Sequence, residues 1–109
     1  MDMRVITVNQ IEGFHNWPSA PKQVEYLAYR HRHIFYIECQ FGVTDQDRQI
    51  EIFIQQQSIG NCLNEKYGQP AEFGAMSCEM IAHDILAAYE KCLLCVVRED
   101  GLGGAVVVR

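Results

Sequence analysis

Apolar and polar residues alternate along two stretches of the chain, as they do in half-buried β-strands. The first stretch runs from Val5 to Gln10 and continues to His15, and we interpret Gly13 as a bulge near its end. The second stretch runs from His31 to Val43. Its odd-numbered positions form an apolar face that contains Phe35, Ile37, Cys39 and Phe41. The pattern predicts two long strands, each with one face toward a core.

Two later segments repeat their apolar residues at helical spacing instead of alternating. The first begins near Ile52 and ends at Gly68, which Pro70 follows. The second begins after Ser77, a residue type that caps helix N-termini. Its apolar stripe consists of Ile81, Ala82, Ile85, Leu86 and Tyr89. Residues 16–29 hold two prolines, and we expect a loop there with a short helical turn in its later part.

The C-terminal part of the chain has the pattern of a β-hairpin, with strands at Cys92 to Glu99 and Gly104 to Val108. The predicted order is strand, strand, helix, helix, strand, strand, an α+β arrangement in a single domain over residues 1–109. Cys92 and Cys95 form a C-x-x-C pair, but residues three apart on a strand face opposite sides. We therefore expect these cysteines to be packing residues that do not share a metal ion.

Composition and charge narrow the classes of function. The chain has 109 residues, 49% of them hydrophobic and 21% charged, with a net charge of −5. No cluster of Lys and Arg is present to neutralise a phosphate backbone, so a nucleic-acid polymer is not expected as a partner. No apolar run approaches the roughly 20 residues that cross a bilayer, and residues 1–4 lack a signal-peptide core. Five cysteines without a framework spacing suit a reducing compartment, so we expect a cytoplasmic protein without membrane attachment.

Three histidines are the strongest indication of chemistry in the sequence. His31 and His33 lie two residues apart on the second predicted strand, so both imidazoles point to one face. His15 adds a third imidazole if the two strands are neighbours. Three nitrogen ligands with an open fourth position are typical of a catalytic or substrate-binding zinc ion. The alternative is that the rings are solvated or hydrogen-bonded on the strand and bind no metal.

Four motifs, in this order, resemble the 6-pyruvoyl-tetrahydropterin synthase and 6-carboxy-tetrahydropterin synthase family. Phe14-His15 is similar to the segment with the first zinc ligand of that family, and His31-Arg32-His33-Ile34-Phe35 to the His-Gly-His-aromatic segment with the other two. Ser77 to Ala82 resembles the segment Thr-Ser/Thr-Glu-x-x-Ala, which opens the second helix beside the pterin pocket. Val97 to Asp100 resembles the segment Val-x-Glu-Thr, whose glutamate anchors the pterin ring.

The resemblance implies the T-fold, with the order ββααββ, a four-stranded antiparallel sheet and two helices on one face. It also implies a homo-oligomer, in which subunits close their sheets into a barrel and remove exposed sheet edges. The zinc ligands that it implies are His15, His31 and His33. The ligand-binding residues that it implies are Glu99, Glu79, Cys78 and Ser77.

The chemistry of a carboxylate supports an anchoring role of Glu99 independently of the family. A carboxylate accepts two parallel N–H bonds from the amidine edge of a pterin or a guanine. The alternative for Glu99 is a solvated carboxylate at a strand end, and the alternative for Glu79 is an acid favoured by the helix dipole. Cys78, at the same helix N-terminus, either lines the pocket with a lowered pKa or is a small buried apolar side chain.

Two departures from the family concern catalysis. The family enzymes have a proton-shuttling cysteine shortly before the His-x-His pair, but residues 24–30 contain none. They also have a Leu-Asp-His segment between the helices, but residues 67–74 contain neither aspartate nor histidine. Proton transfer beside a zinc ion needs a base within hydrogen-bond reach, and Glu25, Tyr26 and Cys78 are the candidates that could substitute.

These features lead to two main hypotheses of function. In the first, the chain is an oligomeric binding protein that holds a pterin, purine or nucleotide-like small molecule through Glu99 near a zinc ion, without catalysis. The chain also resembles a group of phage-encoded proteins with Trp-Pro-x-Ala-Pro and His-Arg-His segments, for which sequestration of a nucleotide in the host cytoplasm is one use. In the second, it is an active zinc-dependent tetrahydropterin synthase-like lyase with a relocated base. A third possibility is a structural T-fold whose histidines bind nothing.

Overall fold

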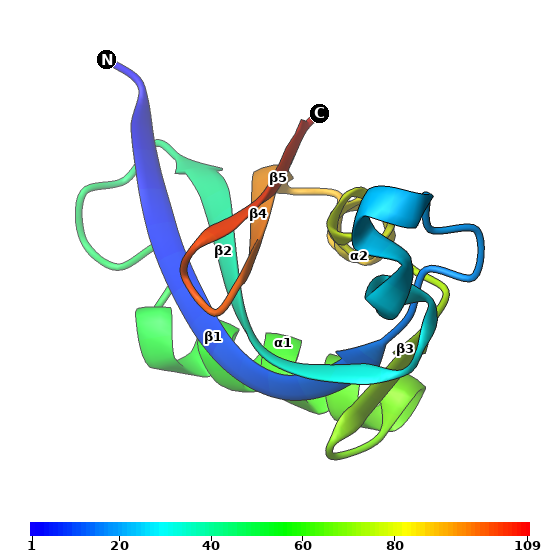
Figure 1. Ribbon diagram of the computed structural model, residues 1–109. Helices are drawn as coiled ribbons and strands as arrows, with labels where there is room; N and C mark the ends of the chain where they lie inside the picture. Colours follow the sequence, from blue (N-terminus) through cyan, green and yellow to red (C-terminus); the bar gives the residue numbers. More distant parts are fainter.

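The two long strands expected from the sequence form the centre of the molecule. The structure, a computed structural model, describes all residues 1–109. β1 (Met3–His15) and β2 (His31–Val43) pair antiparallel over their whole length, which places His15 directly opposite His31. Both strands bend strongly along their length, and the bend gives the sheet a concave side (Figure 1).

The sheet has five strands in the order β3-β1-β2-β4-β5. β4 (Cys92–Glu99) pairs antiparallel with β2 and with β5 (Gly103–Val108), which confirms the predicted hairpin. β3 (Ala71–Gly74) pairs parallel with the end of β1. The expectation of a four-stranded, purely antiparallel sheet is therefore wrong, because this fifth strand makes the sheet mixed. At four residues β3 is too short for a periodic pattern, and it lies in the segment assigned to the connection between the helices.

Three helices connect the strands. η1 (Lys22–Ala28) is a short 3-10 helix between β1 and β2, in agreement with the expected helical turn. α1 (Ile52–Tyr67) follows β2, and α2 (Cys78–Ala88) precedes β4. Ser77 caps α2 as predicted, because its hydroxyl oxygen accepts a hydrogen bond from the N–H of Met80. None of the helices combines the length and the apolar character needed to cross a bilayer.

One hydrophobic core joins β2 to α1 and α2. The odd-numbered face of β2 contributes Phe35, Ile37, Cys39 and Phe41, as the alternation predicts. Burial of an aromatic or aliphatic side chain of this size stabilises the fold by roughly 1.5–3 kcal/mol, so the core determines which face of β2 is covered. His31 and His33 share the parity of these residues, and they therefore lie at the edge of the covered face.

Cys92 and Cys95 both face the core, whereas residues three apart on a regular strand would point to opposite sides. A bulge causes the difference. The ladder between β2 and β4 shifts by one residue at Leu93, which returns the two cysteines to the same face. Both thiols are fully buried, so the two cysteines are packing residues, as expected, although for a different geometric reason.

The sequence predicted a bulge at Gly13, and this prediction is wrong. It pairs regularly with His33 in the β1–β2 ladder. A Cβ atom at this position would lie 2.8 Å from the ring of Phe73 and 3.1 Å from the ring of Phe35. The glycine therefore allows two aromatic rings to pack against β1 beside the histidines.

Candidate metal centre and adjoining cavity

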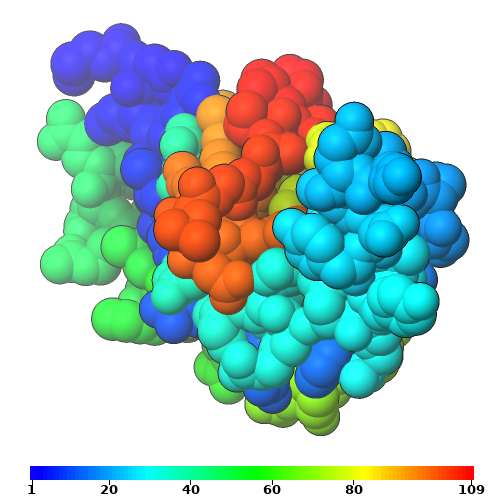
Figure 2. All heavy atoms as spheres, viewed as in Figure 1, coloured from blue at the N-terminus to red at the C-terminus, as the bar shows by residue number.

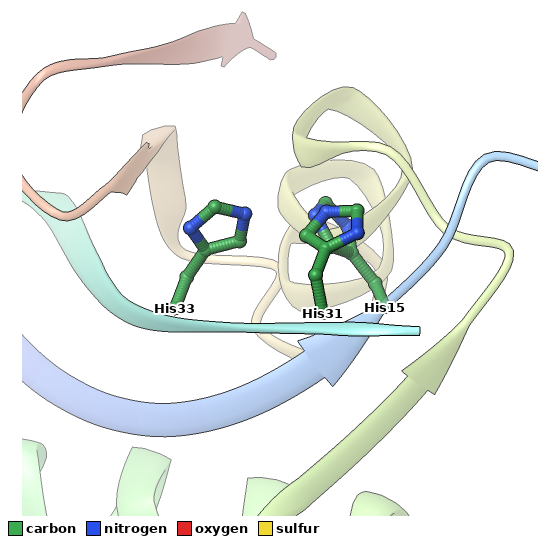
Figure 3. A group of neighbouring side chains, drawn as sticks. All are labelled: His15, His31 and His33. Atoms are coloured by element: carbon green, nitrogen blue, oxygen red, sulfur yellow. The ribbon is translucent and has the colours of Figure 1, made fainter. Parts of the chain in front are cut away.

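His15, His31 and His33 converge at one end of the covered sheet face, as the strand periodicity predicts. His15 lies opposite His31, and His33 follows two residues later on the same face of β2. One ligating atom from each histidine lies within 4.8 Å of the other two, and the ring centroids are 4.6 to 5.1 Å apart. Figure 3 shows the three imidazoles rising from β1 and β2 on the same side. The structure thus brings together the three predicted zinc ligands.

The Nδ1 atoms of His15 and His31 are held by backbone carbonyl groups. Nδ1 of His15 is 2.9 Å from the carbonyl oxygen of Met76, and Nδ1 of His31 is 2.8 Å from that of Tyr29. Because a carbonyl oxygen only accepts, each Nδ1 atom carries the hydrogen and donates it. The Nε2 atoms of the neutral rings then keep their lone pairs, which is the tautomer that binds a metal ion through Nε2.

His33 is oriented by a side chain instead. Its Nδ1 atom donates to Oδ2 of Asp100 at 2.6 Å, and Oδ1 of Asp100 accepts a hydrogen bond from the N–H of Ile34 at 2.9 Å. The hydrogen bond from His33 is the main reason that the pKa of Asp100 lies below its usual value. Asp100 is therefore an ionised acceptor, held at two points, that fixes the orientation of the His33 ring.

The Nε2 atom of His33 is buried and has no hydrogen-bond partner. Oε2 of Glu99 lies 3.1 Å away, but the two atoms are not aligned for a hydrogen bond. A buried polar atom without a partner costs about 1–3 kcal/mol. A zinc ion bound by the three Nε2 atoms would satisfy this atom, so the residues present fit the metal that the sequence suggests.

His15 is the most enclosed of the three histidines, with 8% of its surface exposed. Burial lowers the pKa of His15 below its ordinary value of 6.5, and this effect outweighs the opposing hydrogen bond to Met76 and the charge of Glu99. The ring of Phe35 packs edge-on against the imidazole, with the centroids 5.2 Å apart. His15 is therefore neutral at pH 7, which is the form that a metal ion requires.

A cavity of about 560 Å³ opens beside the three histidines. Its walls come from the end of β1, the end of η1, the start of α2 and the turn between β4 and β5. Figure 2 shows the hollow between the orange β4–β5 turn and the cyan segment that contains the end of η1, with olive atoms of α2 at its base. Its lining includes all four predicted ligand-binding residues, Ser77, Cys78, Glu79 and Glu99. The metal candidates and the ligand candidates therefore form one site.

Glu25 and Tyr26, two of the three candidates for a catalytic base, are not part of this site. Both are exposed on η1 and do not line the cavity, whereas Leu27 on the same short helix does. The structure thus gives neither residue a position from which to move a proton beside the three histidines.

Cys78, the other candidate base, lines the cavity, but its thiol is not activated. Burial, reinforced by the neighbouring Glu99 carboxylate, raises the pKa of Cys78 to about 12. The thiol donates a hydrogen bond to Oε1 of Glu99, with sulfur and oxygen 3.3 Å apart. The alternative of a lowered pKa is therefore wrong, because burial and an adjacent negative charge outweigh the helix N-terminus. Cys78 is a neutral donor to Glu99.

Sequence reasoning missed the role of Asp100. The family segment that Val97 to Asp100 resembles has a threonine at the last position, and the resemblance directed attention to Glu99 alone. The available signal was a second carboxylate directly after a predicted strand. Its use would have required the pairing of β2 with β4, which places Glu99 opposite Phe35 and therefore Asp100 close to His33.

Comparison of the sequence with models of known protein families and with curated proteins finds no match. We therefore infer the function from the geometry of the site.

Proposed function

We propose that the protein binds a zinc ion through His15, His31 and His33 and uses it, together with Glu99, to hold a small planar heteroaromatic molecule. The observation that carries this proposal is the hydrogen bonding of the three rings. Each Nδ1 atom has an acceptor, and the Nε2 atom of His33 is buried without a partner. Metal-binding histidines almost always donate their second ring hydrogen to an acceptor in this way, and a metal ion would give the unpaired Nε2 atom of His33 a partner.

The size and lining of the cavity support a small-molecule ligand. Its volume of about 560 Å³ lies within the usual range of ligand pockets. The zinc ion would leave one coordination position on the cavity side, where it would polarise a carbonyl or hydroxyl oxygen of the ligand. Trp17 lines the cavity and is 47% exposed, so an aromatic side chain is available there for contact with a planar ligand.

Glu99 is the group that would select the ligand. Its carboxylate faces the cavity, and it accepts a hydrogen bond from the neutral thiol of Cys78. An amidine edge, such as that of a pterin or a guanine, would donate two parallel N–H bonds to this carboxylate. A ligand without that edge would leave the carboxylate unpaired in a partly closed site, which favours the matching class.

Binding is favoured over catalysis by the state of the candidate bases. The pKa of Cys78 is raised, and Glu25 lies outside the site. The second candidate function is a zinc-dependent lyase similar to tetrahydropterin synthases. One observation favours it: Glu79 lines the same cavity and could act as a relocated base. Formation of a tetrahydropterin product by the zinc-loaded protein would decide for this alternative.

The proposal includes a T-fold homo-oligomer. The four antiparallel strands β1, β2, β4 and β5 lie side by side in the sheet, and β5 forms one of its two edges. Val106 and Val108 on this edge strand are 55% and 66% exposed. An edge of this kind is usually covered, and a second subunit that extends the sheet would cover it. The five free thiols suit a reducing compartment, so we place the oligomer in the cytoplasm, that of the host if the chain is viral.

Calorimetric titration of the zinc-loaded protein with neopterin and with guanosine monophosphate tests this function. We expect binding of at least one probe, weakened by about tenfold or more (about 1.4 kcal/mol) when a chelator has removed the zinc ion. The exposed Glu90 provides a control, because Glu90→Gln is expected to bind like the wild type, whereas Glu99→Gln is not. Equal affinity with and without zinc, or no binding of either probe, would contradict the proposal.

A further inference from the structure

We infer that Glu99 is itself the fourth zinc ligand in the ligand-free protein and that it leaves the metal when a small molecule enters the cavity. This inference rests on the proposed zinc site and goes beyond it, since it makes one carboxylate serve in turn as metal ligand and as ligand anchor. The resemblance to the synthase family suggests only the anchoring role.

The first argument is the distance between the carboxylate and the imidazoles. Oε2 of Glu99 lies 3.1 Å from Nε2 of His33, and Oε1 lies 3.5 Å from Nε2 of His15. In a tetrahedral zinc site with bonds of about 2.05 Å, neighbouring ligand atoms are about 3.3 Å apart. Each carboxylate oxygen therefore lies at about this separation from one histidine, Oε2 from His33 and Oε1 from His15, which places the Glu99 carboxylate directly beside the three imidazoles.

The second argument is that the two facing groups, the Nε2 atom of His33 and the carboxylate of Glu99, can both act as acceptors. With its Nδ1 hydrogen donated to Asp100, a neutral His33 ring would present an Nε2 lone pair on the side of Glu99. A carboxylate also presents only lone pairs. Two acceptors 3.1 Å apart repel each other unless a cation lies between them or a proton joins them. A zinc ion held by the three imidazoles would be such a cation, and it would give the buried Nε2 atom of His33 a partner.

The third argument is that Glu99 is free to leave. The only hydrogen bond that a side chain donates to its carboxylate comes from the thiol of Cys78, a weak donor. The side chain is 35% accessible, although the backbone of Glu99 is fixed in β4 between Phe35 and Gly103. A rotation of the side chain alone would therefore release the metal position without any change of the sheet.

These features describe an exchange of partners at the metal. In the ligand-free state a bond from the Glu99 carboxylate to the zinc ion would occupy the fourth position in place of water. On binding, this bond would be exchanged for one from a ligand oxygen, and the released Glu99 carboxylate would accept the two N–H bonds of the amidine edge. A molecule that has only the metal-binding oxygen or only the amidine edge would replace one of these interactions but not the other. The site would therefore bind it more weakly than a molecule that has both groups.

The test compares the wild type with Glu99→Gln and with the exposed control Glu90→Gln, using zinc affinity and the visible spectrum of the Co²⁺-substituted proteins. Glutamine keeps the size of the side chain but removes the charge, and Glu99→Asp provides a second variant that keeps the charge. We expect Glu99→Gln to weaken zinc binding by more than the roughly 10–100-fold that loss of a group outside the coordination shell costs, and to change the Co²⁺ spectrum, whereas Glu90→Gln does neither. Addition of neopterin or guanosine monophosphate to the wild type should also change the spectrum.

The outcomes separate the two proposals. If the wild type and Glu99→Gln bind zinc equally and have the same Co²⁺ spectrum, Glu99 is not a metal ligand, but the three-histidine site stands. If the wild type binds no zinc, the proposed function itself fails. A folded metal-free Glu99→Gln protein, checked by its circular dichroism spectrum, excludes misfolding as the cause of lost affinity.

Discussion

Replacement of His33 by alanine is expected to abolish stoichiometric zinc binding. The variant keeps only two of the three imidazoles, and the substitution does not alter the main-chain groups that pair with Gly13. A ligand that binds only the folded state stabilises it by about 4 kcal/mol at a thousand times its Kd, which for a domain of this size corresponds to roughly 15 °C in Tm. We therefore expect zinc to raise the Tm of the wild type by an amount of this order and to leave that of His33→Ala unchanged.

His83 provides a matched control for this experiment. It is the fourth histidine of the chain, and it is exposed on α2 outside the cavity. His83→Ala should retain both the zinc content and the zinc-dependent rise in Tm. The zinc affinity of Asp100→Asn should lie between those of His33→Ala and His83→Ala, about 10–100 times weaker than that of the wild type. This variant keeps the His33 ring but loses the charged acceptor that orients it. Unchanged zinc binding by His33→Ala would show that this histidine is not a ligand.

Acidification is expected to release the zinc ion and to destabilise the metal-free protein as well. Protons compete with zinc for the Nε2 lone pairs, so the zinc-dependent rise in Tm should disappear as the pH falls below 7. In the metal-free protein, burial holds the pKa of His15 below its ordinary value of 6.5. The unfolded chain therefore takes up a proton at a higher pH than the folded protein does. The free energy of unfolding is then complete above pH 6.5 and falls as the pH decreases toward the lowered pKa of His15.

The free energy of unfolding of the metal-free protein is measured by urea unfolding in the presence of a chelator, between pH 7.5 and about 5. The contribution of His15 gives a slope of at most about 1.4 kcal/mol per pH unit. His15→Gln has no titrating group at this position and should show a correspondingly flatter profile. A stability that rises on acidification, or a profile that is the same in His15→Gln, would contradict the assignment.

The sequence predicted the long elements well because their patterns are long. β2 coincides with the alternation from His31 to Val43, and α2 begins after its predicted cap at Ser77. β3 was missed because four residues carry no periodic signal. The common face of Cys92 and Cys95 was missed because a bulge depends on the pairing between two strands and not on either strand alone.

The candidate site was predictable to the extent that it follows from strand parity. Parity brings His31 and His33 to one face, and the antiparallel pairing adds His15. The acceptors of the Nδ1 atoms were not predictable, since two of them are backbone carbonyls, of Met76 and Tyr29, which every residue type possesses. Their positions depend on how η1 and the loop before α2 fold onto the strands.

The state of Cys78 was also not predictable, because two opposing effects act on its thiol. The helix N-terminus favours the thiolate, whereas burial and the Glu99 carboxylate favour the thiol. The sequence shows the first effect, since the cap of α2 can be recognised. It does not show the second, which depends on the tertiary approach of β4 to α2.

The location of the site follows from the covered face of the sheet. The histidines extend the buried row of β2 beyond the point at which the core ends, and the segments around α2 and the β4–β5 turn leave a cavity there. Polar side chains at such an edge are shielded enough to be held in fixed orientations and remain accessible to a small molecule. The same arrangement explains why the pKa of His15 is lowered while Glu99 remains partly accessible.

The central claim is the zinc ion, and elemental analysis of untagged protein, purified without chelators, tests it most directly. The mass of the same sample under native conditions gives the number of chains, so the zinc content can be stated per subunit. We predict one zinc ion per chain in the wild type and none in His33→Ala. Wild-type protein that contains no zinc, and takes up none when zinc is added, would contradict the claim.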